Sequence, residues 1–287
     1  MTETRTLETP DVDLVYDVHG PLPPADGKPV LLMIGQPMTA DGFGALAGHF
    51  ADRTVITYDP RGLGRSKRKD GRDDLTPQDQ AEDLHRLIAA LDAGPVQVFA
   101  SSGGAVTGLE LVTRYPEDVS MLVAHEPPIN AVLPDAEGAD KARARFNDAY
   151  EAKGEGAGMA AFMAMAAWHG EFTDEYFAQP VPNAAAFGMP SEDDGKRDNP
   201  LLSKRSWAVT GYRPDVEAIK KARVIVAVGE ESAGTYTART AEGLAKALGQ
   251  EAVVFPSHHG GFLGGEFGYA GKPAEFAAKL RDVLDAA

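Results

Sequence analysis

Short, continuously apolar runs recur along the chain, and each predicts a strand that is buried on both faces of a parallel sheet. The clearest runs are Val30–Ile34, Thr54–Tyr58, Met121–Ala124, Val224–Val228 and Ala252–Phe255, and the β-type residues Val96, Val98 and Phe99 mark a further strand. Val12–Val18 alternates apolar and polar residues instead, which is typical of a half-buried edge strand. The pattern therefore predicts one sheet whose centre is shielded from water on both sides.

Helical periodicity separates several of these runs. Thr76-Pro77 predicts the start of an amphipathic helix, which Gly94-Pro95 ends. Further helices are expected at Phe43–Phe50, Tyr236–Leu248 and Pro273–Leu284. Strands that alternate with helices predict a doubly wound, mostly parallel α/β sheet, in which ligands bind at the carboxyl ends of the strands.

The alternation stops between Pro128 and Ala222, where helical patterns occur without buried strands. We expect a core domain of residues 1–128 and 222–287, with residues 129–221 inserted as a helical cap over the strand ends. The segment Gly158–Trp168 is apolar nearly all round, so its side chains either pack the cap onto the core or line a pocket. The candidate pocket residues are Met38, Met159, Phe162, Met163 and Trp168.

A candidate nucleophile lies where one predicted strand runs into a helix, in the stretch VQVFASSGGAVTG from Val96 to Gly108. A tight strand-to-helix turn holds its apical residue in a strained conformation and needs small residues two positions before and after it. Ser102 meets this need, with Ala100 behind it and Gly104 ahead. Ser101 does not, because Phe99 would stand where the small residue belongs. Ser101 is therefore expected to be a packing or hydrogen-bonding neighbour.

A serine hydroxyl needs a base within hydrogen-bond reach, and the base needs an orienting acid. The loop after the last strand offers two histidines, His258 and His259. His259, which small residues follow, is the preferred base, and His258 is the alternative. A metal site at this pair is disfavoured, because adjacent histidines point apart and no third ligand has suitable spacing.

Composition narrows the classes of partner. The net charge of −15 disfavours nucleic acid and anionic membranes, both of which are bound through Lys and Arg. The chain has no cysteine, which removes disulfides, thiolate metal sites and a cysteine nucleophile. The first residues, MTETRTLETPDVDL, lack the apolar core of a signal peptide, so a cytoplasmic protein is expected. A homodimer is left open.

The order of these motifs resembles the α/β-hydrolase fold superfamily over residues 12–128 and 222–284. The matching segments are Gly35-Gln36-Pro37, with Ile34 where the family has histidine, Asp59–Ser66, Ala100–Gly104 and His259–Phe262. The resemblance implies that the backbone N–H groups of Gln36 and Gly103 form an oxyanion hole. It also implies that no cofactor is required. A serine at position 102 argues against the haloalkane dehalogenase and epoxide hydrolase branches, which use aspartate there.

The acid departs from the family pattern. The family usually places Asp where this chain has Ser232, in Gly229-Glu230-Glu231-Ser232. Serine cannot supply the charge that stabilises an imidazolium. We expect Glu126, at the end of the preceding strand, to take this role, with Glu230 or Glu231 as the alternative acid.

The expected function is hydrolysis of an ester, lactone or related acyl bond of a small, largely apolar substrate, through an acyl-enzyme on Ser102. Two alternatives use the same scaffold. One is a protein that binds a small ligand with little or no turnover. The other is a cofactor-free haloperoxidase or perhydrolase activity. No metal or cofactor is expected in any of the three.

Overall fold

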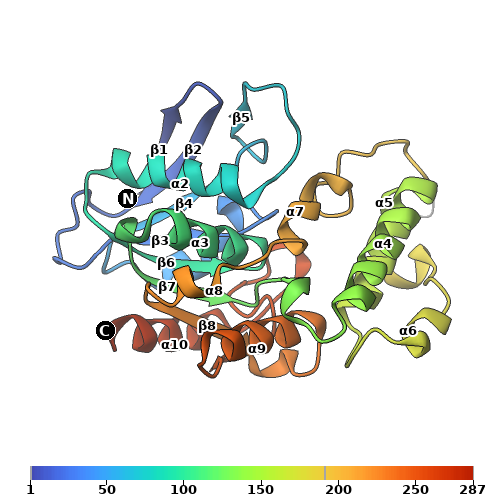
Figure 1. Cartoon of the computed structure of the whole chain (residues 1–287). Coiled ribbons are helices and arrows are strands. Elements are labelled where there is room, and N and C mark those ends of the chain that lie inside the picture. Colours follow the sequence, from blue (N-terminus) through green and yellow to red (C-terminus); the bar gives the residue numbers. More distant parts are fainter. Residues whose placement is uncertain (1, 191, 287) are drawn as a thin grey trace.

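The core of the molecule is a nine-stranded sheet in the order β1-β2-β4-β3-β6-β7-β8-β9, with β5 paired to β2. It is seen in a computed structural model that describes residues 2–190 and 192–286 (Figure 1). The strands are β1 (Thr2–Glu8), β2 (Val12–His19), β3 (Leu31–Ile34), β4 (Val55–Tyr58), β5 (Lys67–Arg68), β6 (Val96–Ser101), β7 (Val119–His125), β8 (Val224–Gly229) and β9 (Val253–Phe255). All pairings from β4 to β9 are parallel, and those of β2 are antiparallel. The predicted mostly parallel sheet is confirmed.

The expectation that Val12–Val18 forms an edge strand is wrong. This segment lies in β2, which pairs with β1 on one side and with β4 on the other. Its alternation reflects one buried and one half-exposed face, which a strand inside a sheet can also have. The true edge strand, β1, has the polar sequence TETRTLE and largely exposed side chains, so no hydrophobic signal marks it.

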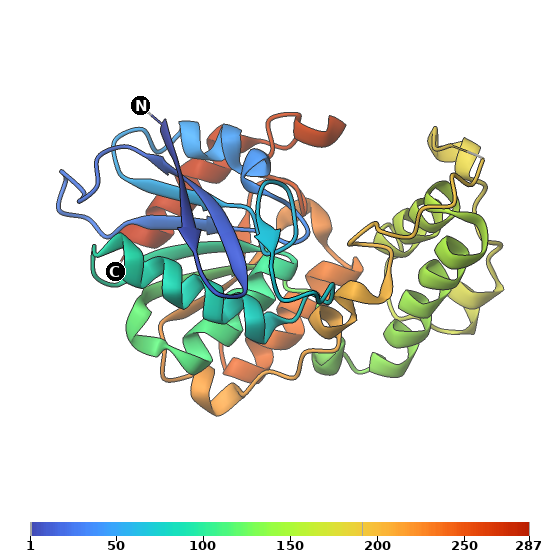
Figure 2. The ribbon, with the colours of Figure 1, turned by 90° about the horizontal axis from the view of Figure 1, so that it is seen from above.

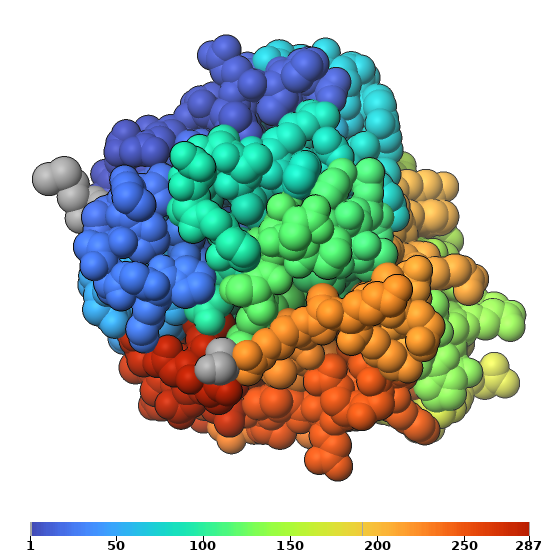
Figure 3. Space-filling view, turned by 60° about the vertical axis from the view of Figure 1, so that its left-hand side comes forward, coloured from blue at the N-terminus to red at the C-terminus, as the bar shows by residue number. Residues whose placement is uncertain are grey.

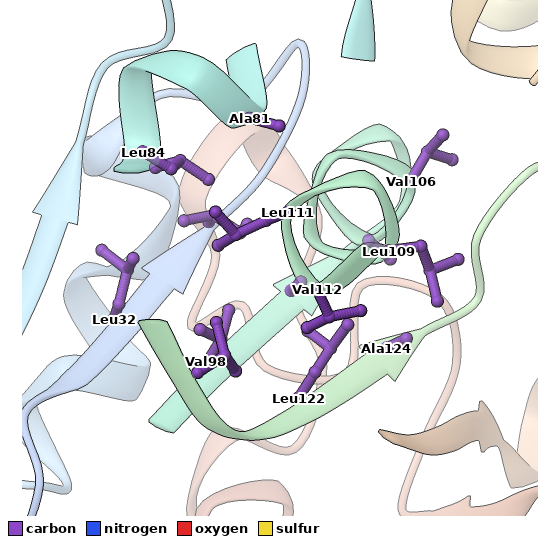
Figure 4. Close-up of a cluster of buried hydrophobic side chains, with 14 of the residues drawn as sticks. Leu32, Ala81, Leu84, Val98, Val106, Leu109, Leu111, Val112, Leu122 and Ala124 are labelled. Atoms are coloured by element: carbon purple, nitrogen blue, oxygen red, sulfur yellow. The ribbon is translucent and has the colours of Figure 1, made fainter. Parts of the chain in front are cut away.

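Helices cover both faces of the sheet, which is why β3, β4 and β6 are buried at every position. On one face, Leu109, Leu111 and Val112 of α3 gather over Val98 and Leu122 of the strands (Figure 4). The helices on this face are α2 (Pro77–Leu91), α3 (Gly103–Arg114), α8 (Val216–Ile219) and α9 (Tyr236–Leu248). The opposite face carries α1 (Gly44–Gly48) and α10 (Pro273–Asp285). None of the described helices combines the length and apolar character needed to cross a membrane.

Residues 129–221 lie between β7 and β8 and, as far as they are described, add no strand to the sheet. We call this segment the insertion. It contains α4 (Ala136–Lys153), α5 (Glu155–Ala166), α6 (Asp174–Ala178), α7 (Trp207–Thr210) and α8. Helices α4 to α6 stand to one side of the sheet and have an apolar cluster of their own, whereas α7 and α8 pack on the sheet side (Figures 1 and 2).

The two ends of the chain lie on the side of the sheet away from α4 to α6 (Figure 1). Figure 3 shows the C-terminal helix α10 against the N-terminal quarter of the chain. Lys28 pairs with Asp285 at 3.0 Å, and Arg281 pairs with Asp52 at 2.8 Å. These pairs hold the C-terminal helix against the N-terminal part of the chain.

Candidate active site

Ser102 stands at the apex of the turn that joins β6 to α3. Its backbone has φ 57° and ψ −128°, in the region that residues with side chains rarely adopt. The Ser102 N–H donates to the His125 carbonyl at 2.9 Å, and the Ser102 carbonyl accepts from the Ala105 N–H at 2.9 Å. These bonds on both sides hold the strained conformation and lift the hydroxyl out of the sheet.

The neighbours of Ser102 are small because other backbone lies against them. A Cβ atom at Gly104 would stand 2.6 Å from the Gly35 Cα and 2.6 Å from the Ile34 oxygen. Ala100 faces Gly108 of α3, where an added Cβ would lie 3.3 Å from the Ala100 Cβ. The turn is thus packed against β3 and its own helix, and larger residues would push these elements apart.

Glu126 and His259 are joined directly, although 133 residues separate them in the chain. The Glu126 Oε2 lies 2.6 Å from the His259 Nδ1. Because Nδ1 is held by the carboxylate, Nε2 is the ring nitrogen that remains for another partner. Ser102 and His259 both line one cavity of about 550 Å³, so the two groups open onto the same space.

Glu126 is buried completely and still fully partnered. Its Oε1 accepts the Gly229 N–H at 2.9 Å, and its Oε2 accepts the Thr237 hydroxyl at 2.7 Å. Burial alone would raise the Glu126 pKa, but the hydrogen bond and charge of His259 outweigh it and hold the pKa well below its usual range. The carboxylate therefore stays charged beside the imidazole.

The alternative acids, Glu230 and Glu231, and the alternative base, His258, have different surroundings. Glu230 and Glu231 are about half exposed, and both lie within 3.5 Å of Lys272 and not on His259. His258 holds the loop instead, because its Nδ1 accepts the Gly260 N–H at 3.1 Å and its Nε2 lies 3.2 Å from the Ala270 carbonyl. The geometry therefore groups Glu126 and His259 with Ser102.

The backbone N–H groups of Gln36 and Gly103, both on residues that line the cavity, are free of hydrogen-bond partners among the described residues. Gly103 is the first residue of α3, whose N-terminal N–H groups have no partner within the helix. The Gln36 side chain is fixed from α2, since its Oε1 accepts the buried Gln80 amide at 2.7 Å. Sequence reasoning missed Gln80, because nothing in a helix pattern marks one buried glutamine.

The insertion supplies much of the cavity wall. Of the candidate pocket residues, Phe162 and Met163 of α5 line the cavity. Met38 packs instead beside Gly35 and Gly42, and Met159 and Trp168 pack in the apolar cluster of the insertion, so these three do not line it. The lining also includes residues that the sequence analysis did not propose, namely Arg143, Trp207, Val209, Thr210 and Tyr236.

His125, next to Glu126, is completely buried among phenylalanine rings. Its Nδ1 lies 3.2 Å from the Ser101 hydroxyl, under the turn that carries Ser102. Burial lowers the pKa of His125 to about 4, so the ring is neutral near pH 7. Across the described residues, no group of three or more His, Cys, Asp or Glu side chains is placed to hold a metal ion.

A parallel sheet that carries a serine on a strained strand-to-helix turn, with a carboxylate-bound histidine on the same cavity, has the layout of the α/β-hydrolases. Residues 28–255 match the family model described as alpha/beta hydrolase fold, and the chain therefore belongs to this family. The chain is 30% identical to a Bacillus subtilis (strain 168) protein named "Uncharacterized hydrolase YraK", over 98% of this chain and 95% of that protein.

Solved structures agree with this fold. A thermophilic esterase from Thermogutta terrifontis superposes with a TM-score of 0.62 at 20% identity, over 100% of this chain and 98% of that chain. A proline iminopeptidase from Mycobacterium smegmatis superposes with a TM-score of 0.62 at 21% identity, over 99% of this chain and 98% of that chain. At such identities these similarities show the shared fold and do not show which reaction this chain catalyses.

Proposed function

We propose that the protein is a serine hydrolase that cleaves an ester, lactone or related acyl bond through an acyl-enzyme on Ser102. The observation that carries the proposal is the buried Glu126 bound to His259 at 2.6 Å, with His259 on the same cavity as Ser102. Packing alone does not require a buried carboxylate that orients a histidine on the same cavity as a strained serine. Membership of the hydrolase family supports the same reading.

In the proposed reaction, the Ser102 hydroxyl attacks the carbonyl carbon while the His259 Nε2 takes its proton. Glu126 holds the Nδ1–H and stabilises the imidazolium that forms. The carbonyl oxygen becomes an oxyanion and accepts hydrogen bonds from the Gln36 and Gly103 N–H groups, each worth about 3 kcal/mol in the barrier. His259 then protonates the leaving alcohol, and it activates a water that releases the acyl group as an acid.

The cavity supports a small, largely apolar substrate. Its volume of about 550 Å³ is that of a ligand of moderate size. Phe162, Met163 and Val209 present carbon surface to this space. Substrate binding would therefore draw mainly on burial of apolar area, while the backbone donors set the position of the reacting carbonyl.

A fluorophosphonate probe, which modifies activated serines, tests the proposal. We expect stoichiometric labelling of the wild type, loss of labelling in Ser102→Ala, and retained labelling in Ser101→Ala. The neighbouring serine is the matched control, because it is buried beside His125 and does not line the cavity. Folded wild-type protein that takes up no probe would contradict the proposal and would favour a ligand-binding role.

A further inference from the structure

One arginine lines the cavity among apolar and mostly uncharged polar side chains. Arg143, on α4, has only 13% of its side chain exposed. Among the residues that line this cavity, it is the single lysine or arginine, and Glu231 is the single carboxylate. Glu231 is 44% exposed and pairs with Lys272, so its charge is neutralised at the surface. Arg143 therefore dominates the charge that a bound ligand would meet.

The guanidinium is fixed close to the nucleophile. Its Nη1 donates to the Trp207 carbonyl at 3.3 Å and to the Thr210 hydroxyl, and the group lies 4.7 Å from the centre of the Trp207 ring. The helix α7 that offers these partners also touches the catalytic turn, because Val209 lies 3.3 Å from where a Gly103 Cβ would be. The cation is thus held one short helix away from Ser102.

One N–H₂ group of this arginine is only partly used by the protein. Nη1 donates both of its protons to partners on α7, and the Nε–H, which has no partner in the described chain, is shielded from solvent and does not face the cavity. Nη2 lies 3.1 Å from Asp140, which is 53% exposed and also accepts the Asn130 amide at 2.7 Å. Because water screens an exposed carboxylate more than a buried cation, Asp140 offsets only part of the Arg143 charge inside the cavity.

We propose that Arg143 binds a carboxylate at the far end of the acyl chain, so that the preferred substrates are esters of dicarboxylic half-acids. A guanidinium on the cavity wall, whose Nη2 has only an exposed carboxylate as its partner, matches a carboxylate better than it matches a methyl group. This inference rests on the proposed acyl hydrolysis and narrows its substrate class. Arg143 acts in binding and positioning, and the reacting atoms remain those of Ser102 and His259.

Two esters that differ only at the chain end test this assignment. Mono-4-nitrophenyl adipate ends in a carboxylate, and 4-nitrophenyl 6-methylheptanoate ends in an uncharged isopropyl group of the same shape. We expect Arg143→Gln to lower kcat/KM for the adipate half-ester about tenfold or more, chiefly through KM, and to change that of the neutral ester by no more than about threefold. Arg145→Gln, on the same helix and outside this cavity, is the matched control and leaves the ratio unchanged.

The outcomes separate binding from a structural tie between α4 and α7. If Arg143→Gln reduces both esters equally, or if the wild type rejects the half-ester while hydrolysing the neutral one, the assignment is overturned. Calorimetric binding of both esters to Ser102→Ala protein repeats the comparison without turnover. If Ser102→Ala protein binds the half-ester more tightly than the neutral ester, and Arg143→Gln abolishes this preference, the carboxylate site is upheld. Failure of the wild type to hydrolyse either ester would count against the proposed hydrolysis and not against this site.

Discussion

At the scale of single residues, Glu126 carries the strongest expectation. Replacing it with glutamine keeps the size of the side chain but removes the charge that His259 faces at 2.6 Å. The amide also turns one N–H₂ group toward a donor, either the Gly229 N–H or the Thr237 hydroxyl and the His259 ring, so the hydrogen bonds that orient the imidazole are weakened. We expect Glu126→Gln to lower kcat about 10³- to 10⁴-fold, measured with a 4-nitrophenyl ester.

The matched controls are Glu230→Gln and Glu231→Gln, which alter carboxylates on the neighbouring loop that pair with Lys272. Both are expected to retain kcat within about threefold of the wild type, as exposed ion pairs contribute little. If Glu126→Gln keeps full turnover while one of these variants loses it, the role given to Glu126 is wrong.

His125 gives a prediction about stability and pH. Burial depresses its pKa from 6.5 to about 4, so the folded state binds fewer protons than the unfolded state between these values. The contribution of neutral, buried His125 to the free energy of unfolding is complete above pH 6.5. It is lost as the pH falls toward 4, and the loss amounts to roughly 3 kcal/mol. His125→Gln cannot titrate and still offers Ser101 a partner. Urea unfolding at several pH values should show a flatter acid-side decline for this variant, and identical slopes would refute the prediction.

At the scale of elements, the turn between β6 and α3 depends on close backbone approach. An alanine Cβ at Gly104 would meet the backbone of β3 at 2.6 Å, which would displace the segment that carries the Gln36 N–H. We expect Gly104→Ala to cost about 1–3 kcal/mol of unfolding free energy and to reduce kcat as well. Thermal unfolding and ester turnover measure the two effects.

Gly48→Ala, in helix α1, is the control for Gly104→Ala, because a Cβ at Gly48 would have no atom within 4 Å. In helix α1 it should be neutral or stabilise by up to about 1 kcal/mol, with turnover unchanged. If Gly104→Ala changed stability and turnover no more than Gly48→Ala does, the close approach between the turn and β3 would be important for neither.

Elements with a strong apolar signal were predictable, and those without one were not. The central strands, α9 and most of α2 and α10 followed from pattern, since each buries a defined set of side chains. Strand β1 did not, because backbone pairing with β2 holds it and its side chains face water. The orientation of α5 was equally hidden, because a helix that is apolar all round does not reveal that Phe162 faces the cavity while Met159 does not. Arg143 was hidden as well, because nothing in the sequence distinguishes it from the neighbouring charges Asp140, Lys141 and Arg145.

At the scale of the whole molecule, one arginine of α9 helps to hold the insertion against the core. Arg239 pairs with Asp135 at the start of the insertion, and it donates to the Gly170 carbonyl at 2.7 Å. Both side chains of the pair are nearly buried, at 12% and 11% exposed. Asp135 in turn accepts the Phe172 N–H at 2.7 Å, so this contact links two separate stretches of the insertion to the body.

Replacing Arg239 with glutamine should loosen the insertion without unfolding the sheet, because it leaves the nearly buried carboxylate of Asp135 without its cation. We expect amide hydrogen exchange in residues 135–172 to rise about tenfold or more, while exchange in β3, β6 and β7 stays as in the wild type. KM for an ester should rise, since α4 and α5 form part of the cavity wall. Arg197→Gln, which removes an exposed pair with Asp193 in the insertion, should change neither quantity. Equal exchange in both variants would mean that apolar packing alone holds the insertion over the strand ends.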